Sequence, residues 1–243
     1  MSIIHKRKVD YGQDMIGLIK ILISTGSLAV IAGLFFLFKN QDKNPGIVVP
    51  LLIAAGFLAF LYCAIGIWSS RIGKRIMCDR VMNVITWRGD EKVLDVGCGQ
   101  GLLLIGAAKR LATGKAYGID NYQSTFEFNN SKDKAVRNAE AEGVGDRVEI
   151  QTADARELPF PARIFDVVAS SLVLHHVPEF SKALGEMARV LKKDGTIVIV
   201  DIAPMTKKYI PVLENLGLTI VENSRTVPLF LFPFRMIAAQ FEG

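Results

Sequence analysis

The sequence predicts an α/β fold: a seven-stranded, mostly parallel sheet between two layers of helices, preceded by two transmembrane helices. Three observations support this prediction. Two long uncharged apolar runs precede residue 70, short strand-like and helix-like segments alternate after it, and a glycine-rich turn directly follows the first strand-like segment. We therefore divide the chain into an N-terminal membrane segment, residues 1–70, and a globular domain, residues 71–243.

Hydrophobic and basic residues are unevenly distributed. Half of the 243 residues are hydrophobic, with the excess before residue 70, and much of the formal net charge of +5 lies on both sides of that apolar region. The basic clusters at 6–8 and 71–80 fit anionic lipid headgroups better than a nucleic-acid groove, because no stripe of Lys and Arg interleaved with aromatics follows. A lipid bilayer is therefore an expected partner, and nucleic acid is not.

Each apolar run has the length of a membrane span. The first covers residues 16–38 and the second residues 47–68, close to the ~20 residues needed to cross a hydrocarbon core. Lys20 interrupts the first run near its end, where its ammonium group can reach the membrane interface. The link at 39–46 is short and turn-forming, which predicts an antiparallel helical hairpin.

The charges beside the spans predict their orientation. Lys and Arg are abundant before the first span and after the second, whereas the link holds only Lys39 and Lys43 against Asp42. The positive-inside rule therefore places the N-terminus and the globular domain in the cytoplasm. The alternatives are a cleaved signal peptide, disfavoured by the lack of a clear cleavage site, and a buried pair of helices.

Cysteine usage indicates neither a disulfide scaffold nor a metal site. The three cysteines are Cys63 in an apolar run, Cys78, and Cys98 within the glycine-rich turn. Their number is odd and their spacing matches no metal-binding pattern, so we expect a reducing compartment for the globular domain and no bound metal.

Strand and helix patterns alternate through the globular domain. Apolar residues at helical spacing over 71–87 predict an amphipathic helix that leads away from the membrane. The expected strands are 92–96, 116–119, 148–151, 166–170, 196–200, 218–221 and 236–239, and the expected helices are 102–111, 131–142, 179–191 and 207–216. This alternation predicts a parallel sheet covered on both faces, with the last two strands forming an antiparallel hairpin at its edge.

The glycine-rich turn at 93–101, Val-Leu-Asp-Val-Gly-Cys-Gly-Gln-Gly, carries the most chemical information. Its alternate glycines allow sharp backbone angles and the close approach of a ligand. A dinucleotide site requires G-x-G-x-x-G, but Leu102 occupies the third glycine position. Asp95 precedes the first glycine by two residues, which suits a cationic sulfonium with an amino-acid tail better than a pyrophosphate.

Two further acidic residues follow strand-like segments. Asp120 lies about 20 residues after the glycine turn, where a carboxylate can accept hydrogen bonds from both ribose hydroxyls. Asp154 ends the third strand, where it can accept a hydrogen bond from an adenine amine while Ala155 offers its backbone amide. Considered alone, Asp120 would more often be a helix cap or a solvated residue, and Asp154 a turn residue. The glycine turn upstream favours the ligand-binding interpretation of Asp120.

An ordered set of motifs resembles a known enzyme family. The motifs are the turn at 93–101, Gly-Ile-Asp at 118–120, TADARELPFP at 152–161, FDVVASSLVLHHVP at 165–178 and VLKKDGTIVIVD at 190–201. Over about residues 80–243 they resemble the class I S-adenosylmethionine-dependent methyltransferases, in the branch with the ubiquinone and menaquinone C-methyltransferases. The resemblance implies the Rossmann-like fold of that class, methyltransferase activity and S-adenosylmethionine as cofactor.

The resemblance also implies roles for individual residues. Ser171 would lie at the edge of the cofactor pocket, and Asn121 would join Asp120 at the ribose. The adenine would be held by Asp154 and Ala155. The family's usual Gly-Gly after the fifth helix appears here as Asp194-Gly195, a departure that affects a turn rather than the site. The residues expected to hold the methionine part are Asp95, Gly97, Gly99, Gln100 and Gly101.

Two of the three histidines, His175 and His176, follow the fourth strand and are candidate catalytic residues. Methyl transfer needs a base only when the acceptor is a phenol, a hydroxyl or an acidic carbon that must lose a proton. Either histidine could deprotonate or orient such an acceptor, and the alternative is that one caps a turn and the other lines the pocket.

The acceptor is expected to be a lipophilic small molecule such as a quinone, an isoprenoid or a lipid. The hairpin places the globular domain at a bilayer, and the aromatic segment 227–234 could cover the substrate, enter the interface or pack against a helix. The alternatives are a soluble small molecule or a protein as acceptor, a nucleotide-dependent oxidoreductase, and a non-catalytic protein with the same fold.

Overall fold

A computed structural model describes Val9, Tyr11 and residues 16–39, 46–123, 130–225 and 233–241. The basic cluster at 6–8, most of the link between the apolar helices and most of the aromatic segment 227–234 lie outside these residues. The predictions made for those three segments therefore stay predictions.

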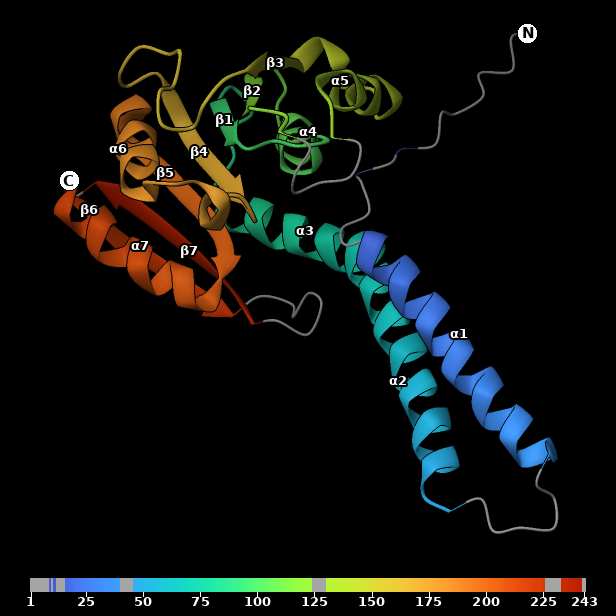
Figure 1. The fold of residues 1–243 in the computed structure, drawn as a ribbon. Coiled ribbons are helices and arrows are strands. Elements are labelled where there is room, and N and C mark those ends of the chain that lie inside the picture. The colour runs from blue at the N-terminus through green and yellow to red at the C-terminus, as the bar shows by residue number, and fades with distance from the viewer. Residues whose placement is uncertain are drawn as a thin grey trace, which may run out of the picture.

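Two long apolar helices, α1 (Ile16–Lys39) and α2 (Val48–Trp68), form a stem that projects from the globular domain (Figure 1). Both are long and apolar enough to cross a membrane. They approach closely at Gly56, where a Cβ atom would lie 2.4 Å from Cγ2 of Val30 and 2.8 Å from the carbonyl oxygen of Gly26. Glycine at this crossing permits the contact, as in closely packed membrane helices.

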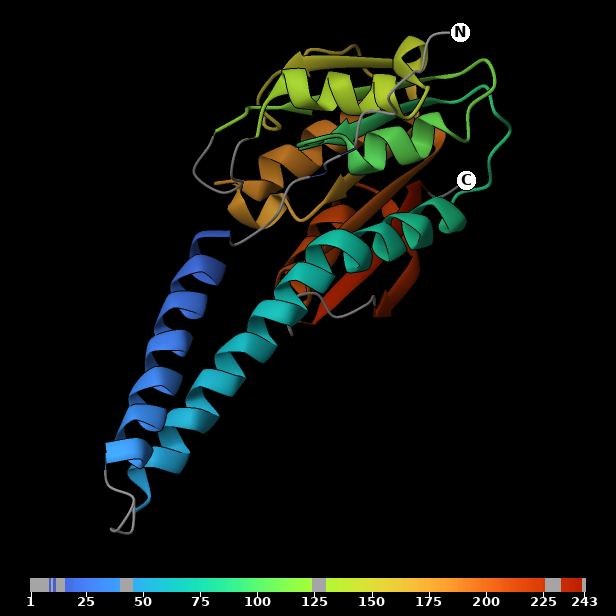
Figure 2. The same ribbon diagram turned by 90° about the vertical axis from the view of Figure 1, so that its right-hand side faces the viewer.

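The second apolar helix runs into the globular domain without a break. A single π-helical turn, Ser69–Gly73, connects α2 to α3 (Lys74–Val84). The sequence predicts a separate helix over 71–87, whereas the structure continues one helix from Val48 to Val84 and ends it where Ile85 becomes extended. Figure 2 shows this helix passing from the stem along the face of the domain. The apolar stem and the domain are thus joined by helix rather than by a flexible linker.

Within the described residues, seven strands form one sheet: β1 (Lys92–Val96), β2 (Lys115–Asp120), β3 (Val148–Thr152), β4 (Phe165–Ser171), β5 (Leu191–Ile202), β6 (Leu218–Arg225) and β7 (Phe234–Phe241). Their order is β3-β2-β1-β4-β5-β7-β6, and β7 is antiparallel to both of its neighbours. The predicted parallel sheet with an antiparallel last strand is confirmed. The chain reverses its strand order between β1 and β4, which is where α/β folds bind ligands.

Helices cover both faces of the sheet. One face packs against α3, α4 (Leu102–Ala108) and α5 (Lys132–Ala141), and the other against α6 (Phe180–Val190) and α7 (Ala203–Asn215). Adjacent strand residues alternate between the two cores: Val93 and Val167 face the first, whereas Leu94 and Val168 face the second. This alternation follows from strand geometry. Because helices cover both faces of the sheet, the strands are apolar on both faces.

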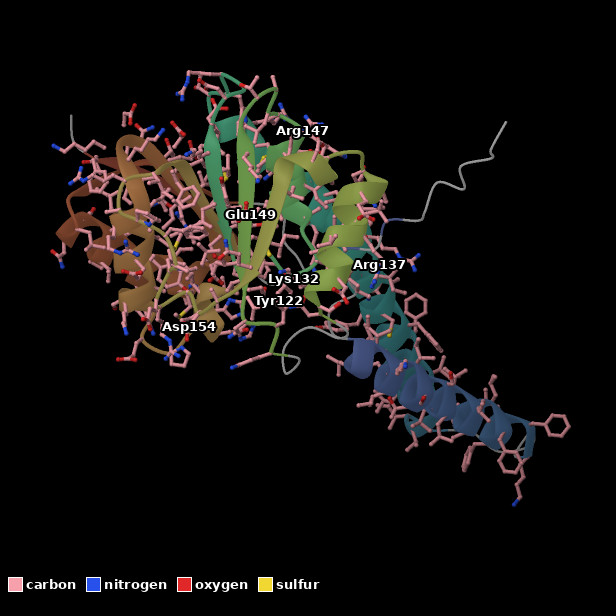
Figure 3. All side chains as sticks on the ribbon, turned by 90° about the horizontal axis from the view of Figure 1, so that it is seen from above. Tyr122, Lys132, Arg137, Arg147, Glu149 and Asp154 are labelled. Carbon is pink, nitrogen blue, oxygen red and sulfur yellow. The ribbon has the colours of Figure 1, made fainter. Side chains whose placement is uncertain are left out.

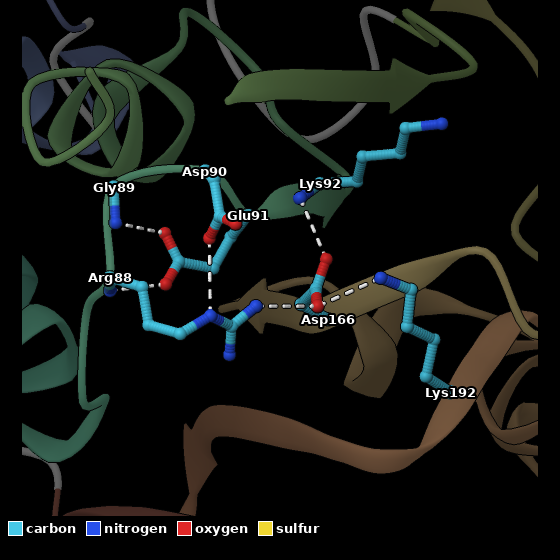
Figure 4. Close-up of polar contacts among 7 residues, drawn as sticks. All are labelled: Arg88, Gly89, Asp90, Glu91, Lys92, Asp166 and Lys192. Carbon is cyan, nitrogen blue, oxygen red and sulfur yellow. Dashed lines mark hydrogen bonds and ion pairs between the residues drawn. The ribbon is translucent and has the colours of Figure 1, made fainter. Parts of the chain in front are cut away.

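An ionic cluster ties the strands together at the end opposite the site described below. Asp166, near the start of β4, accepts hydrogen bonds from the Lys92 backbone at 2.9 Å, Arg88 at 3.0 Å and Lys192 at 2.9 Å (Figure 4). Glu91 accepts from the backbone N–H groups of Arg88 and Gly89 in the same loop. The amino ends of β1 and β4 are therefore fixed, and their carboxyl ends converge on the site.

Candidate active site

The glycine turn after β1 is built from backbone conformations that favour glycine. Gly97 and Gly99 have φ angles of 77° and 50°. The N–H groups of Gly97 and Cys98 both donate to the carbonyl oxygen of Ile119, at 2.8 and 2.9 Å, which holds the turn against the end of β2. The predicted strand–turn–helix is confirmed, and the turn leaves backbone exposed toward the site.

The carboxylate of Asp95 is buried beneath this turn. Its Oδ2 accepts the N–H of Leu104, in the first turn of α4, at 2.9 Å. Burial raises the pKa of Asp95 to about 7, opposed by the Leu104 hydrogen bond and increased by the charge of Asp120. A cation bound beside Asp95 would favour its ionised form.

Asp120 connects the end of β2 to the glycine turn. Its Oδ2 accepts the N–H of Gly99 at 2.9 Å, and its Oδ1 accepts the N–H of Tyr122 at 2.7 Å. These two bonds fix the orientation of the carboxylate, as a residue that receives ribose hydroxyls requires.

Asp154 is placed at the same edge of the domain as Tyr122, opposite Arg147 (Figure 3). Its carboxylate pairs with Arg156, with 2.6 Å between Oδ2 and the guanidinium, and this hydrogen bonding lowers the pKa of Asp154. The sequence did not predict the Arg156 pair, which occupies part of the carboxylate expected to meet an adenine amine. Ala155 beside it is buried.

Nearly all of the predicted site residues line one cavity of about 740 Å³. Its size lies in the range of small-molecule and cofactor sites. Gly101 is the exception: it precedes α4 with a φ of 91°, and a Cβ there would lie 3.2 Å from Ile105 and 3.7 Å from Ala135. The structure therefore gives Gly101 a packing role beside the cavity. The predicted residues that line the cavity are Asp95, Gly97, Gly99, Gln100, Asp120, Asn121, Asp154, Ala155, Ser171, His175 and His176.

Two amide side chains at this cavity have unsatisfied polar atoms. Gln100 is 3% exposed, and neither its Nε2 nor its Oε1 has a hydrogen-bond partner among the described residues. Oδ1 of Asn130 is likewise buried without a partner there, and both residues line the cavity. Such atoms are costly unless a ligand satisfies them. A donor and an acceptor from Gln100 fit the amino-acid end of S-adenosylmethionine.

Asp201, which the sequence did not single out, holds His175 in place. It is fully buried at the end of β5, and its Oδ1 lies 2.5 Å from Nδ1 of His175. The ring of His176 lies against that of His175, with 3.8 Å between the centroids and 45° between the ring planes, and burial together with His175 lowers the pKa of His176. His175 and His176 form the short helix η3 (Leu174–His176) after β4, at the cavity wall.

Segments next to the apolar stem supply a part of the cavity wall that the sequence also did not predict. Lys74 and Met77 line it from α3, and Tyr11 lines it from the segment before α1. Tyr11 also donates to Glu142 at 3.0 Å and lies under the guanidinium of Arg75. Met77 lies on the apolar face of the predicted helix 71–87 and could have been suspected, whereas Tyr11 gave no signal. Across the described part of the chain, no cluster of His, Cys, Asp or Glu is arranged to hold a metal ion.

Comparison with known proteins supports this geometry. The model of a methyltransferase domain family matches residues 94–199. An uncharacterised protein of Haemophilus influenzae is 33% identical over 142 residues, covering 58% of this chain and 53% of that protein. Demethylmenaquinone methyltransferase of Staphylococcus aureus is 34% identical over 138 residues, covering 56% and 52% respectively. The chain thus spans about half the length of these relatives.

Solved structures share the fold at lower identity. A SAM-dependent methyltransferase from Aquifex aeolicus aligns with a TM-score of 0.57 at 20% identity, over 73% of this chain and 97% of that one. Geranyl diphosphate C-methyltransferase from Streptomyces coelicolor aligns with a TM-score of 0.59 at 15% identity, over 70% and 79%. Residues 94–199 thus match a methyltransferase domain, and the sheet order and glycine turn belong to a fold that the chain shares with these solved methyltransferases.

Proposed function

We propose that the protein transfers a methyl group from S-adenosylmethionine to a lipophilic small molecule that it receives from a membrane. One observation carries the proposal: α3, which lines the cavity with Lys74 and Met77, directly continues the second apolar helix. The cavity wall therefore begins less than two helical turns after Trp68.

The cofactor would occupy the half of the cavity beneath the glycine turn. Gly97, Gly99, Gln100 and Asp95 would hold its amino-acid end and neighbouring sulfonium. Asp120 and Asn121 would hold the ribose, Asp154 and Ala155 the adenine, and Ser171 would border the pocket. The cofactor supplies an activated methyl group, so the protein's task is to align the acceptor with it and to exclude water.

The acceptor would occupy the other half, between η3, α3 and the ends of β5 and β7. Met77, Leu172, Ile202 and Phe234 give this wall an apolar character, and the two histidines and Lys74 provide polar groups. Such a surface suits a molecule with a large apolar part and a single reactive polar end. The names of two similar proteins, demethylmenaquinone methyltransferase and geranyl diphosphate C-methyltransferase, are consistent with a quinone or isoprenoid acceptor.

The apolar stem would anchor the enzyme with both ends of the chain in the cytoplasm. Basic residues at 6–8 and 71–80 would then lie beside anionic headgroups at the same interface. This arrangement would hold the cavity at the membrane surface, where a lipophilic acceptor is concentrated.

The acceptor class can be tested with radioactive cofactor. Membranes containing the full chain would be incubated with methyl-tritiated S-adenosylmethionine and chemically reduced demethylmenaquinone, and the organic and aqueous phases counted. The proposal predicts label in the organic phase, and predicts its loss when Met77→Trp fills the acceptor half of the cavity. Label that appears only in water-soluble compounds or protein would overturn the lipophilic acceptor and support a soluble one.

A further inference from the structure

We propose that Asp201 is the positioning residue of a His175–Asp201 pair that removes a proton from a hydroxyl-bearing acceptor. The proposal rests on the proposed function, because it assigns a task to the acceptor half of the same cavity. Asp201 is the last residue of the motif at 190–201, at the end of an apolar strand, but the sequence analysis assigned it no role.

Asp201 is held as a fully buried, fully hydrogen-bonded carboxylate. It accepts the backbone N–H of His175 at 3.1 Å, the backbone N–H of Ile202 at 2.7 Å and the hydroxyl of Tyr209 at 3.0 Å, in addition to Nδ1 of His175. Donors from η3, β5 and α7 thus converge on one side chain. Four donors leave a buried carboxylate little freedom to move.

This arrangement determines which nitrogen of His175 can accept a proton. A carboxylate only accepts hydrogen bonds, so Nδ1 must carry the hydrogen that it shares with Asp201. Nε2, at the opposite corner of the ring, is then the basic nitrogen of a side chain that lines the cavity. A histidine whose tautomer is fixed by a buried aspartate has the arrangement of a general base.

The groups around His175 favour this role for it over His176. Asp201 contacts it from β5, with Tyr209 of α7 behind that carboxylate, and the tilted ring of His176, its neighbour in η3, lies against it. The remaining charged groups of the described cavity wall are Lys74, Asp95, Asp120, Asp154 and Arg156. His175 is held by the buried carboxylate of Asp201, whereas burial and the neighbouring His175 lower the pKa of His176, so we assign the base to His175.

The reaction step balances without any further reactant. Nε2 of His175 takes the proton of the acceptor hydroxyl, and the ring carbon beside the resulting oxyanion forms a bond to the methyl carbon of the cofactor. The carbon–sulfur bond breaks with its electron pair on sulfur, which converts the sulfonium to a neutral thioether. That ring carbon then loses its own hydrogen as a proton, which returns to the oxygen. The proton then passes from His175 to water. Amine acceptors that are already neutral need no such base, so the pair favours a hydroxyl-bearing acceptor.

The pair can be tested in the full chain in detergent, using Asp201→Asn, Asp201→Glu and Tyr209→Phe. Asp166→Asn is a matched control, because Asp166 is also a hydrogen-bonded aspartate of the sheet but lies at the opposite end of β4. With three histidines in the chain, nitrogen-15 histidine NMR can resolve the Nδ1–H of His175 as a strongly downfield proton. Calorimetry measures the affinity for S-adenosylhomocysteine, and the rate of methyl transfer is measured with reduced demethylmenaquinone.

We expect the downfield signal in the unmutated protein and in Asp166→Asn, and its loss in Asp201→Asn. That variant should bind S-adenosylhomocysteine normally, transfer methyl groups on the order of 100-fold more slowly, and show a changed acid limb in its rate–pH profile. Asp201→Glu should recover part of the rate, and Tyr209→Phe should keep the signal while shifting the acid limb.

A signal that survives Asp201→Asn, or parallel losses of rate and cofactor affinity, would overturn the pair. Failure of the unmutated protein to bind S-adenosylhomocysteine would instead contradict the proposed function. Binding of cofactor with no signal that depends on Asp201 would leave the proposed function intact and eliminate the pair.

Discussion

Val173 fills the space in which a side chain on Gly97 would have to lie. A Cβ built on Gly97 would be 2.4 Å from Cγ2 of Val173, and the φ of Gly97 is 77°. The glycine turn is therefore constrained twice, by its left-handed backbone and by the segment that follows β4. This contact links the predicted cofactor turn to the loop that carries the two histidines.

Gly97→Ala should lower both stability and cofactor affinity. Gly143→Ala is a matched control, because Gly143 has a φ of 73° but a Cβ there would meet nothing within 4 Å. The control should cost about 1–2 kcal/mol of unfolding free energy from backbone strain alone, and Gly97→Ala a further ~1–3 kcal/mol from overpacking. A double-mutant cycle with Val173→Ala, which removes both Cγ atoms but keeps the Cβ at 2.8 Å, should show partial coupling when measured by urea unfolding. Equal costs at both glycines would contradict the steric account.

Gln100→Leu should change stability and affinity in opposite directions. The variant removes two buried polar atoms that have no partner in the described structure, so the unliganded protein should gain about 1 kcal/mol of unfolding free energy. Its affinity for S-adenosylhomocysteine should fall about tenfold or more, because the ligand loses its hydrogen bonds. Thermal unfolding and calorimetry measure the two effects. Gln240→Leu, at an exposed site outside the cavity wall whose amide donates to Thr196 at 2.8 Å, should leave the affinity unchanged and lower stability only slightly. Destabilisation by Gln100→Leu would show that the amide is satisfied internally.

Asp95 should make stability fall as the pH rises. Its pKa is raised from the ordinary value of 3.8 to about 7, so between these values the folded state holds a proton that the unfolded state has lost. The stability that this proton contributes is fully present below the pKa of Asp95 in the unfolded state, and it is lost as the pH rises to about 7. Urea unfolding of Asp95→Asn should therefore show a growing advantage over the unmutated protein across this interval. Asp146→Asn, an exposed control, should track the unmutated protein.

Cofactor binding should shift the protonation equilibrium of Asp95. A cationic ligand beside Asp95 favours its ionised form, so binding near pH 7 should release protons and affinity should rise with pH below that value. Calorimetry in buffers of different ionisation enthalpy measures the proton release, which Asp95→Asn should abolish. Proton uptake on binding would contradict this assignment.

Gly56→Ala should loosen the apolar helical hairpin without affecting the domain. Its Cβ would meet Val30 and the Gly26 carbonyl at distances that packed atoms do not adopt. Cys63, which is 4% exposed and lies against α1, is a native reporter, and its alkylation by a maleimide should accelerate in this variant. Gly17→Ala on α1, where a Cβ would meet nothing within 4 Å, should leave the rate unchanged. Similar alkylation rates in both variants would argue against close packing at Gly56.

The fold could be predicted from the sequence because its signals are local. Strand runs such as 92–96, the glycine turn and the helical spacing of 131–142 each depend on neighbouring residues, and all are found near the predicted bounds. The sheet hairpin of β6 and β7 followed from the lack of a helical pattern between them. The two long apolar helices followed from composition alone.

The missed features depend on contacts between residues far apart in the chain. Asp201 lies 26 positions from His175, and Tyr11 lies 131 positions from Glu142. Nothing local distinguishes Asp201 from a residue that ends a strand. The unbroken helix was missed for a different reason: the change from apolar to basic residues after Trp68 marks a change of environment, not of backbone conformation.

Equilibrium binding of S-adenosylmethionine to the purified full chain tests the central claim most directly. Calorimetry should show one site per chain, with affinity reduced at least tenfold in Asp120→Asn, because that change disturbs the carboxylate that joins the glycine turn to the ribose position. The exposed variant Asp146→Asn should bind normally. A full chain that is folded and binds neither S-adenosylmethionine nor S-adenosylhomocysteine would contradict the account.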